Sequence, residues 1–133
     1  MTTSEDRAPG VDVLIADDDA PTRWLLRRLL EKQGFICAEA EDGPSAVALA
    51  QAAPPRCVLL DLVMPGLDGL DTLALLRKLD PHVRVALMTG YNAPREEELA
   101  RAGASALFFK PFDFAQVQRF LVAHPGPAGR ALE

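Results

Sequence analysis

Three consecutive carboxylates, Asp17, Asp18 and Asp19, directly follow an apolar run in the stretch LIADDDAP, residues 14–21. Two like charges ~4 Å apart repel by ~1 kcal/mol in water and by ~4 kcal/mol near a protein surface. A dication would offset this repulsion, and carboxylate oxygens are ligands that Mg²⁺ prefers. Without a cation, we expect one of the three acids to have a raised pKa. The triplet therefore predicts a metal site, although Asp19, just before Pro21, also has the position of a helix N-cap.

Three further polar side chains follow apolar runs: Asp61 after CVLL, Thr89 after VALM and Lys110 after ALFF. A carboxylate can attack phosphorus and form an aspartyl phosphate, and a hydroxyl can donate a hydrogen bond to a phosphoryl oxygen. A lysine can neutralise the charge of a phosphoryl group during its transfer. Each residue alone is weak evidence, because turn and capping residues commonly follow strands. With the acidic triplet they predict Mg²⁺-dependent phosphoryl transfer.

The elements that must position these residues alternate regularly along the chain. Apolar runs typical of strands cover residues 11–16, 35–40, 56–60, 83–88 and 105–109. Helical segments follow them at residues 21–33, 44–53, 70–79, 94–102 and 114–123. Strands that are apolar throughout indicate a parallel sheet with helices on both faces, which is a doubly wound (βα)5 α/β fold. Such sheets bind ligands beyond the carboxyl ends of their strands, where the polar residues stand.

Length and composition bound the function. The chain has 133 residues, which is enough for one domain, and its formal net charge of −5 argues against binding to nucleic acid or to an anionic membrane. No apolar stretch approaches the ~20 residues of a membrane span. We predict that Cys37 and Cys57 are reduced core residues of a cytoplasmic protein. Residues 1–10 are predicted to be a flexible leader, and residues 124–133 a tail or the start of a linker.

The stretches VLIADDD, LLDLVMPGLDG, LMTGY and FFKPF, in this order and at this spacing, resemble the receiver domain of two-component response regulators. The resemblance covers roughly residues 11–123 and implies a CheY-like, flavodoxin-like sheet with strand order 2-1-3-4-5. It implies that Asp61 is the phosphoacceptor. It also implies that Asp17, Asp18, Asp61 and the backbone carbonyl of Val63 hold Mg²⁺.

The resemblance assigns the remaining site residues too. Thr89 and Lys110 would contact the phosphoryl group, and the Lys110–Pro111 peptide bond would be cis. One position departs from the family pattern, because Leu107 stands where receivers commonly carry a Tyr or Phe that partners the switch threonine. Val63 and Tyr91 are bulky and lie beside the site, so we predict slow self-dephosphorylation; a role in merely covering the rim is the alternative.

The resemblance also implies partners. A sensor histidine kinase or a histidine phosphotransfer protein would supply the phosphoryl group, and the domain would catalyse only its own phosphorylation and dephosphorylation. An output partner, or a second copy in a homodimer, would bind the face formed by residues 94–102, 105–109 and 114–123. Trp24 lies on the helix that kinases use in receivers, but a place beside the core is the preferred interpretation. Neither a membrane nor a nucleic acid is expected to bind this domain.

Three rival functions remain open from the sequence. A haloacid-dehalogenase-type phosphatase uses an Asp-x-Asp pair, which Asp17 and Asp19 could form, but Pro21 stands where that family has Thr or Val, and the sequence shows no cap domain. A flavin-binding domain would need a phosphate loop where three acids would repel phosphate. A degenerate receiver that binds partners without phosphorylation is disfavoured by the intact acidic, threonine and lysine set.

Overall fold

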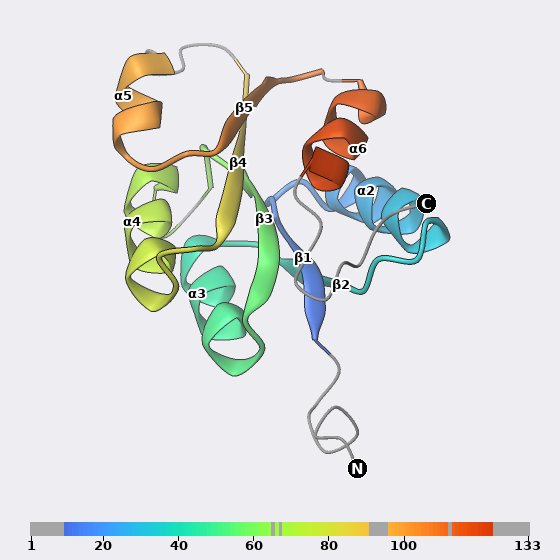
Figure 1. Ribbon diagram of the computed structural model, residues 1–133, viewed down its shortest axis with the longest axis horizontal. Helices are drawn as coiled ribbons and strands as arrows, with labels where there is room; N and C mark the ends of the chain where they lie inside the picture. Colours follow the sequence, from blue (N-terminus) through green and yellow to red (C-terminus); the bar gives the residue numbers. More distant parts are fainter. Residues whose placement is uncertain (1–9, 65, 67, 91–95, 112, 124–133) are drawn as a thin grey trace.

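The computed structural model describes residues 10–64, 66, 68–90, 96–111 and 113–123. Strands and helices alternate along these residues (Figure 1). The strands are β1 (Val11–Ala16), β2 (Cys37–Ala40), β3 (Pro55–Asp61), β4 (Arg84–Thr89) and β5 (Ala106–Phe109). The helices are α2 (Ala20–Lys32), α3 (Gly43–Ala52), α4 (Gly69–Leu79), α5 (Glu96–Arg101) and α6 (Phe114–Ala123). Every one of these elements lies on a predicted one, and β1 and α6 match their predicted ranges.

The five strands form one sheet in the order β2-β1-β3-β4-β5, and each neighbouring pair is parallel. Ala16 at the end of β1 pairs with Ala40 and Leu60, and Asp61 at the end of β3 pairs with Met88. Since the strands share one direction, their carboxyl ends meet along one edge of the sheet. The predicted doubly wound α/β fold is confirmed.

Helices cover both faces of the sheet, with α2 and α6 on one side and α3, α4 and α5 on the other (Figure 1). Alternate residues of β1 face the two layers. Val13 and Ile15 belong to a core cluster with residues of α2 and α6, whereas Leu14 and Ala16 belong to a second cluster with residues of α3, α4 and α5. Burial on both faces explains why the central strands are continuous apolar runs.

Aspartates begin three of the helices. The side chains of Asp19, Asp42 and Asp68 accept hydrogen bonds from the amides of Thr22 (3.1 Å), Ser45 (2.7 Å) and Asp71 (2.8 Å). Each bond satisfies an amide that the first helical turn leaves without a partner. The predicted capping role of Asp19 is therefore confirmed, and α2 ends before Gly34, whose positive φ of 93° suits glycine.

Both cysteines are free and buried in the core layer beneath α2 and α6, as predicted. Burial in apolar surroundings raises the pKa of the Cys37 and Cys57 thiols to about 12. Among the described residues, no helix combines the length and the apolar character needed to cross a membrane. The predicted leader (apart from Gly10) and the predicted tail lie outside the described residues.

Candidate functional site

The carboxyl edge of the sheet brings the predicted acids together. Asp17 follows β1 and Asp61 ends β3, and the neighbouring positions of these two strands place them side by side. Asp17, Asp18 and Asp61 each offer one carboxylate oxygen, and these three oxygens lie within 4.8 Å of one another. Asp17 and Asp61 are buried, whereas Asp18 is exposed. Two acids distant in sequence thus share one partly enclosed cluster with a surface acid.

Lys110 compensates the two buried carboxylates. It follows β5, and its Nζ donates to Oδ2 of Asp17 at 2.9 Å and to Oδ2 of Asp61 at 3.1 Å. Both contacts are ion pairs, and the Asp17 side chain is 0% exposed while that of Lys110 is 27% exposed. An ionised carboxylate that is buried without such a partner would be strongly disfavoured. Lys110 therefore brings one positive charge to both carboxylates of this enclosed space.

The pKa values at this edge follow from burial and from these contacts. Burial raises the pKa of Asp61 and the nearby charge of Asp17 adds to this, although hydrogen bonds from the Val63 amide and Lys110 oppose it. Burial alone would lower the pKa of Lys110, but its hydrogen bonds to Asp17 and Asp61 raise it above its usual value. The sequence predicts a raised carboxyl pKa within the triplet, but the raised pKa at this edge is that of Asp61. The pKa of Asp19 is lowered, mainly because its carboxylate accepts hydrogen bonds from Thr22.

The three consecutive acids differ in their roles. Oδ1 of Asp17 accepts a hydrogen bond from the amide of Asp19 at 2.8 Å, so its carboxylate is held at both oxygens. The carboxylate of Asp19 turns to the first turn of α2, where it accepts from both the amide and the hydroxyl of Thr22. Asp17 and Asp18 consequently belong to the acidic cluster, and Asp19 belongs to the helix.

The donor set of this cluster fits a hard cation. It consists of carboxylate oxygens, with no histidine or cysteine among the three residues. Oxygen-only sites favour Mg²⁺ over zinc, which prefers nitrogen and sulfur ligands. Val63 lies beside the cluster, because its amide donates to Oδ1 of Asp61 at 3.0 Å. Its carbonyl as a further ligand remains a prediction.

Thr89 and Leu107 lie on the two strands beyond Asp61. Thr89 ends β4, is 1% exposed, and its carbonyl accepts a hydrogen bond from the Lys110 amide at 2.6 Å. Leu107 is half-buried, pairs with Leu87 and packs against the core layer beneath α3, α4 and α5. The residue opposite Thr89 in the sheet is Phe109, which is 53% exposed. An aromatic side chain therefore does neighbour Thr89, two positions beyond Leu107, and the FF dipeptide in FFKPF is the sequence signal that could have revealed it.

A hollow of about 470 Å³ lies beside Lys110 and is lined mainly by apolar side chains of α2 and by Pro111 and Phe114. The Lys110–Pro111 peptide bond at the wall of this hollow is cis, as the resemblance implies.

Trp24 is 59% exposed on α2, and the guanidinium of Arg28 lies 4.9 Å from the centre of the Trp24 ring. The prediction that Trp24 flanks the core is wrong. Leu26 and Leu30 are the residues of α2 that are buried against the sheet.

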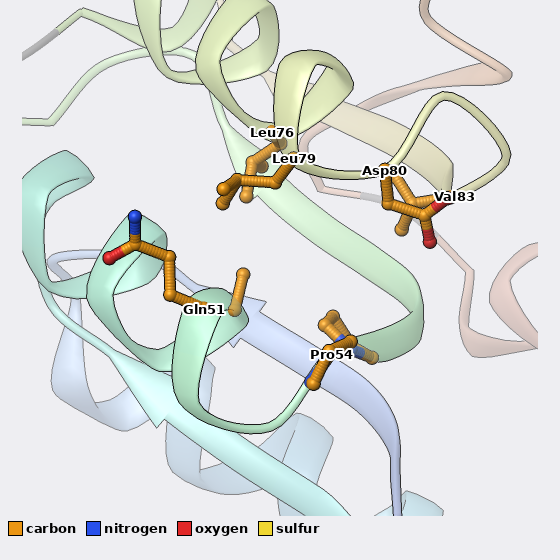
Figure 2. Close-up of a pocket in the computed structure, with 8 residues that line it drawn as sticks. Gln51, Pro54, Leu76, Leu79, Asp80 and Val83 are labelled. Carbon is orange, nitrogen blue, oxygen red and sulfur yellow. The ribbon is translucent and has the colours of Figure 1, made fainter.

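A second hollow, of about 160 Å³, lies at the opposite edge of the sheet (Figure 2). It opens between α3 and α4, with Gln51 on one side and Leu76 and Leu79 on the other, near the start of β3 at Pro55. The carboxylate of Asp80 at its rim accepts a hydrogen bond from the His82 amide at 2.9 Å. This hollow is remote from the acidic cluster and shares no residue with it.

The sequence matches the family model of the response regulator receiver domain over residues 13–121. The chain belongs to this family. This receiver is similar to sporulation initiation phosphotransferase F of Bacillus subtilis, with 34% identity over 107 residues that cover 80% of this chain and 86% of that protein. It is also similar to the photosynthetic apparatus regulatory protein RegA of Cereibacter sphaeroides, with 35% identity over 112 residues, 84% of this chain and 61% of RegA.

Solved receiver structures have the same fold. The receiver domain of NtrX from Brucella abortus matches with a TM-score of 0.75 and 31% identity, covering 82% of this chain and 93% of that one. A CheY-like receiver domain protein from Methanospirillum hungatei matches with a TM-score of 0.78 and 25% identity, covering 85% of this chain and 91% of that one. This chain is accordingly a receiver domain of a two-component response regulator. The phosphatase and flavin-binding interpretations find no support in these matches.

Proposed function

We propose that this receiver accepts a phosphoryl group on Asp61 from a phosphohistidine, in the presence of Mg²⁺, and thereby changes its affinity for a partner. One observation carries this proposal: the buried carboxylate of Asp61 shares the ammonium of Lys110 with Asp17 inside a cluster of three acids. The same arrangement supplies a nucleophile, a positive charge and oxygen ligands within one small space. Its role is signalling rather than turnover of a separate substrate.

The proposed transfer is a displacement at phosphorus. A carboxylate oxygen of Asp61 forms a bond to phosphorus as the bond from phosphorus to the donor imidazole nitrogen breaks, and the imidazole then takes up a proton. Lys110, already 3.1 Å from Asp61, neutralises charge on the phosphoryl group, and the hydroxyl of Thr89 donates to one of its oxygens. Mg²⁺ bound by Asp17, Asp18, Asp61 and the Val63 carbonyl would offset the negative charge of the carboxylates and the phosphoryl oxygens.

The phosphodonor is a sensor histidine kinase or a histidine phosphotransfer protein that docks on α2. An apolar surface next to the acceptor supports this placement. It consists of the hollow beside Lys110 and Pro111 and of the exposed side chains of Trp24 and Leu25. The name of the Bacillus subtilis relative, a phosphotransferase, agrees with a chain that exchanges phosphoryl groups.

The output is a change in binding at the face of α5, β5 and α6. Phe109 on this face is 53% exposed, which suits an aromatic contact with an output partner or with a second copy of the chain. We further propose that residues 11–123 form the receiver, that the flanking ten-residue segments are leader and tail or linker, and that the chain works in the cytoplasm.

The acceptor is tested with a small acyl phosphate. The protein is incubated with this donor and Mg²⁺, and intact mass spectrometry then counts the added phosphoryl groups. One group is expected on the native protein and none on the Asp61→Asn variant. Asp68→Asn is the matched control, because asparagine preserves the cap of α4, and we expect native labelling. Full labelling of Asp61→Asn, with the group mapped to Asp17, would support the phosphatase; an unlabelled native protein would support a degenerate receiver.

Magnesium binding is tested by thermal unfolding. A cation that binds the folded state alone stabilises it by about 2.7 kcal/mol at a concentration 100-fold above its dissociation constant. We expect Mg²⁺ to raise the melting temperature of the native protein, and Asp18→Asn to lose most of that rise. Asp71→Asn, a change on the exposed surface of α4, should keep it. An equal rise in all three proteins would place the cation elsewhere.

A further inference from the structure

Arg23 contacts the acidic cluster through the backbone. It lies in the first turns of α2, and its NH1 group donates to the carbonyl oxygen of Asp17 at 2.7 Å. Its Nε donates to Oε1 of Glu39 on β2, also at 2.7 Å. One guanidinium thus joins the start of the β1–α2 connection to a neighbouring strand. The planar guanidinium makes such a two-directional contact, which an ammonium group does not reproduce.

A second arginine fixes this contact in place. Oε2 of Glu39 accepts from NH1 of Arg27 at 2.9 Å, and Nε of Arg27 donates to Glu31 at 2.9 Å. The side chains of Arg23 and Glu39 are only 16% and 23% exposed, so water competes poorly for these bonds. Networks of charged groups that are partly buried hold their geometry better than isolated surface pairs do. Arg23 is therefore held by a rigid support on the side away from the site.

The carbonyl of Asp17 controls the orientation of the next residue. A peptide bond is planar, so holding the carbonyl oxygen of Asp17 also sets the amide and the Cα of Asp18. The amide of Asp17 is fixed as well, since it donates to the carbonyl of Ala40 at 3.0 Å. Asp18 is exposed, and packing does not confine its side chain as it does that of Asp17. The position of the Asp18 carboxylate therefore depends on the backbone that Arg23 holds.

We propose that Arg23 is a positioning residue for the cation site, which keeps the carboxylates of Asp17 and Asp18 aimed at a common point. Glu39 and Arg27 act one step further out by holding Arg23. The proposal rests on the proposed function, in which Mg²⁺ binds these acids. Groups that orient metal ligands without touching the metal typically change metal affinity 10–100-fold when they are removed.

Charge and positioning predict opposite results here. Arg23 carries a positive charge close to a site for a dication, so Coulomb's law alone says that removing this charge tightens Mg²⁺ binding. Positioning says that removing Arg23 weakens Mg²⁺ binding, because Asp18 loses its orientation. The direction of the change in affinity therefore separates the two effects.

Isothermal titration calorimetry with Mg²⁺ measures this affinity directly. We expect Arg23→Gln and Arg23→Lys each to raise the dissociation constant about tenfold. The lysine variant keeps the positive charge but lacks the planar guanidinium that donates in two directions. Arg28→Gln is the matched control, since Arg28 lies on the same helix and its guanidinium stacks on Trp24. We expect its dissociation constant to be native. Labelling of Arg23→Gln by acyl phosphate should be slow at limiting Mg²⁺ and return towards the native rate at saturating Mg²⁺.

A second variant covers the case in which Arg23→Gln does not fold. Arg27→Gln leaves Arg23 in place but removes a hydrogen bond that holds Glu39. We expect a smaller rise in the dissociation constant, whereas the loss of this positive charge alone would lower the dissociation constant. Native or tighter Mg²⁺ binding by every folded variant of Arg23 and Arg27 would overturn the positioning role while leaving the proposed function intact. A native protein that does not bind Mg²⁺ would overturn both.

Discussion

The Nζ atom of Lys110 lies 3.1 Å from Oδ2 of Asp61, although 49 residues separate the two along the chain. The strand β4 lies between β3 and β5, so this contact crosses the edge of the sheet. The hydrogen bonds with Asp17 and Asp61 outweigh burial and raise the pKa of Lys110, so the ammonium stays charged at neutral pH. The ion pairs of the Lys110 ammonium stabilise the folded state fully below the ordinary pKa of lysine. This stabilisation is lost as the pH rises through the raised pKa of Lys110.

Removing this ammonium should impair phosphorylation more than cation binding. We expect Lys110→Met to lower the rate of labelling by acyl phosphate about 10²–10³-fold, because one electrostatic contact to the transferring group is lost. Mg²⁺ should bind as well or better, because a competing positive charge is gone. Labelling is followed by mass spectrometry and binding by calorimetry, with Lys32→Met at the exposed end of α2 as control. Native labelling by Lys110→Met would exclude the proposed role.

The raised pKa of Asp61 predicts a dependence of stability on pH. Burial disfavours the ionised form, so the folded state binds this proton more tightly than the unfolded state does. The cost to stability is absent below the ordinary aspartate pKa of 3.8, grows as the pH rises above it, and is complete above the raised value. Asp61→Asn removes the cost.

We therefore expect Asp61→Asn to be more stable than the native protein near neutral pH, with the difference shrinking as the pH falls towards 3.8. Chemical denaturation without divalent cations, at several pH values, measures this difference. A gain in stability that is greatest at acid pH would contradict the assignment of the raised pKa.

The exposed side chain of Val63 bears on dephosphorylation. It is 71% exposed, and its amide lies 3.0 Å from Oδ1 of Asp61, so Val63 is next to the proposed acceptor. We predict that its bulk obstructs the approach of water to the acyl phosphate. We expect Val63→Ala to shorten the phosphoryl lifetime several-fold, as followed by mass spectrometry after the donor is removed. Val122→Ala, a similar exposed change on α6, should leave the lifetime unaltered. An unchanged phosphoryl lifetime in Val63→Ala would show that Val63 only covers the rim of the site and does not slow dephosphorylation. Tyr91, the other bulky residue in this prediction, lies outside the described residues.

A substitution at Leu107 tests how phosphorylation changes the proposed output face of α5, β5 and α6. We expect Leu107→Tyr to be labelled at the native rate but to show a larger change in hydrogen exchange at β5 and α5 on phosphorylation, because the usual aromatic partner of Thr89 is restored. Enlarging a half-buried side chain should lower the free energy of unfolding by about 1–3 kcal/mol. An exchange difference equal to the native one would show that position 107 does not carry the signal. Leu107→Met, close to leucine in volume, is the control.

The alternation of apolar runs and amphipathic segments determined the parallel sheet and the helices on both its faces, because the side-chain periods of strands and helices are local properties. The same local logic placed Asp17, Asp61, Thr89 and Lys110 at strand ends, and it identified Asp19 as a helix cap. Parallel strands then leave only one edge at which these residues can gather. For this reason the sequence was sufficient to predict that Asp17, Asp61 and Lys110 gather at the carboxyl edge of the sheet.

Which charges meet, and which contacts hold them, depends on how distant segments of the chain pack together. The ion pairs of Lys110, the raised pKa of Asp61 and the contact of Arg23 with the Asp17 carbonyl each depend on strand order and on burial. The exposure of Trp24 likewise depends on which side of α2 packs against the sheet. These properties arise from packing between segments that are far apart along the chain, and no periodicity within a single segment encodes them.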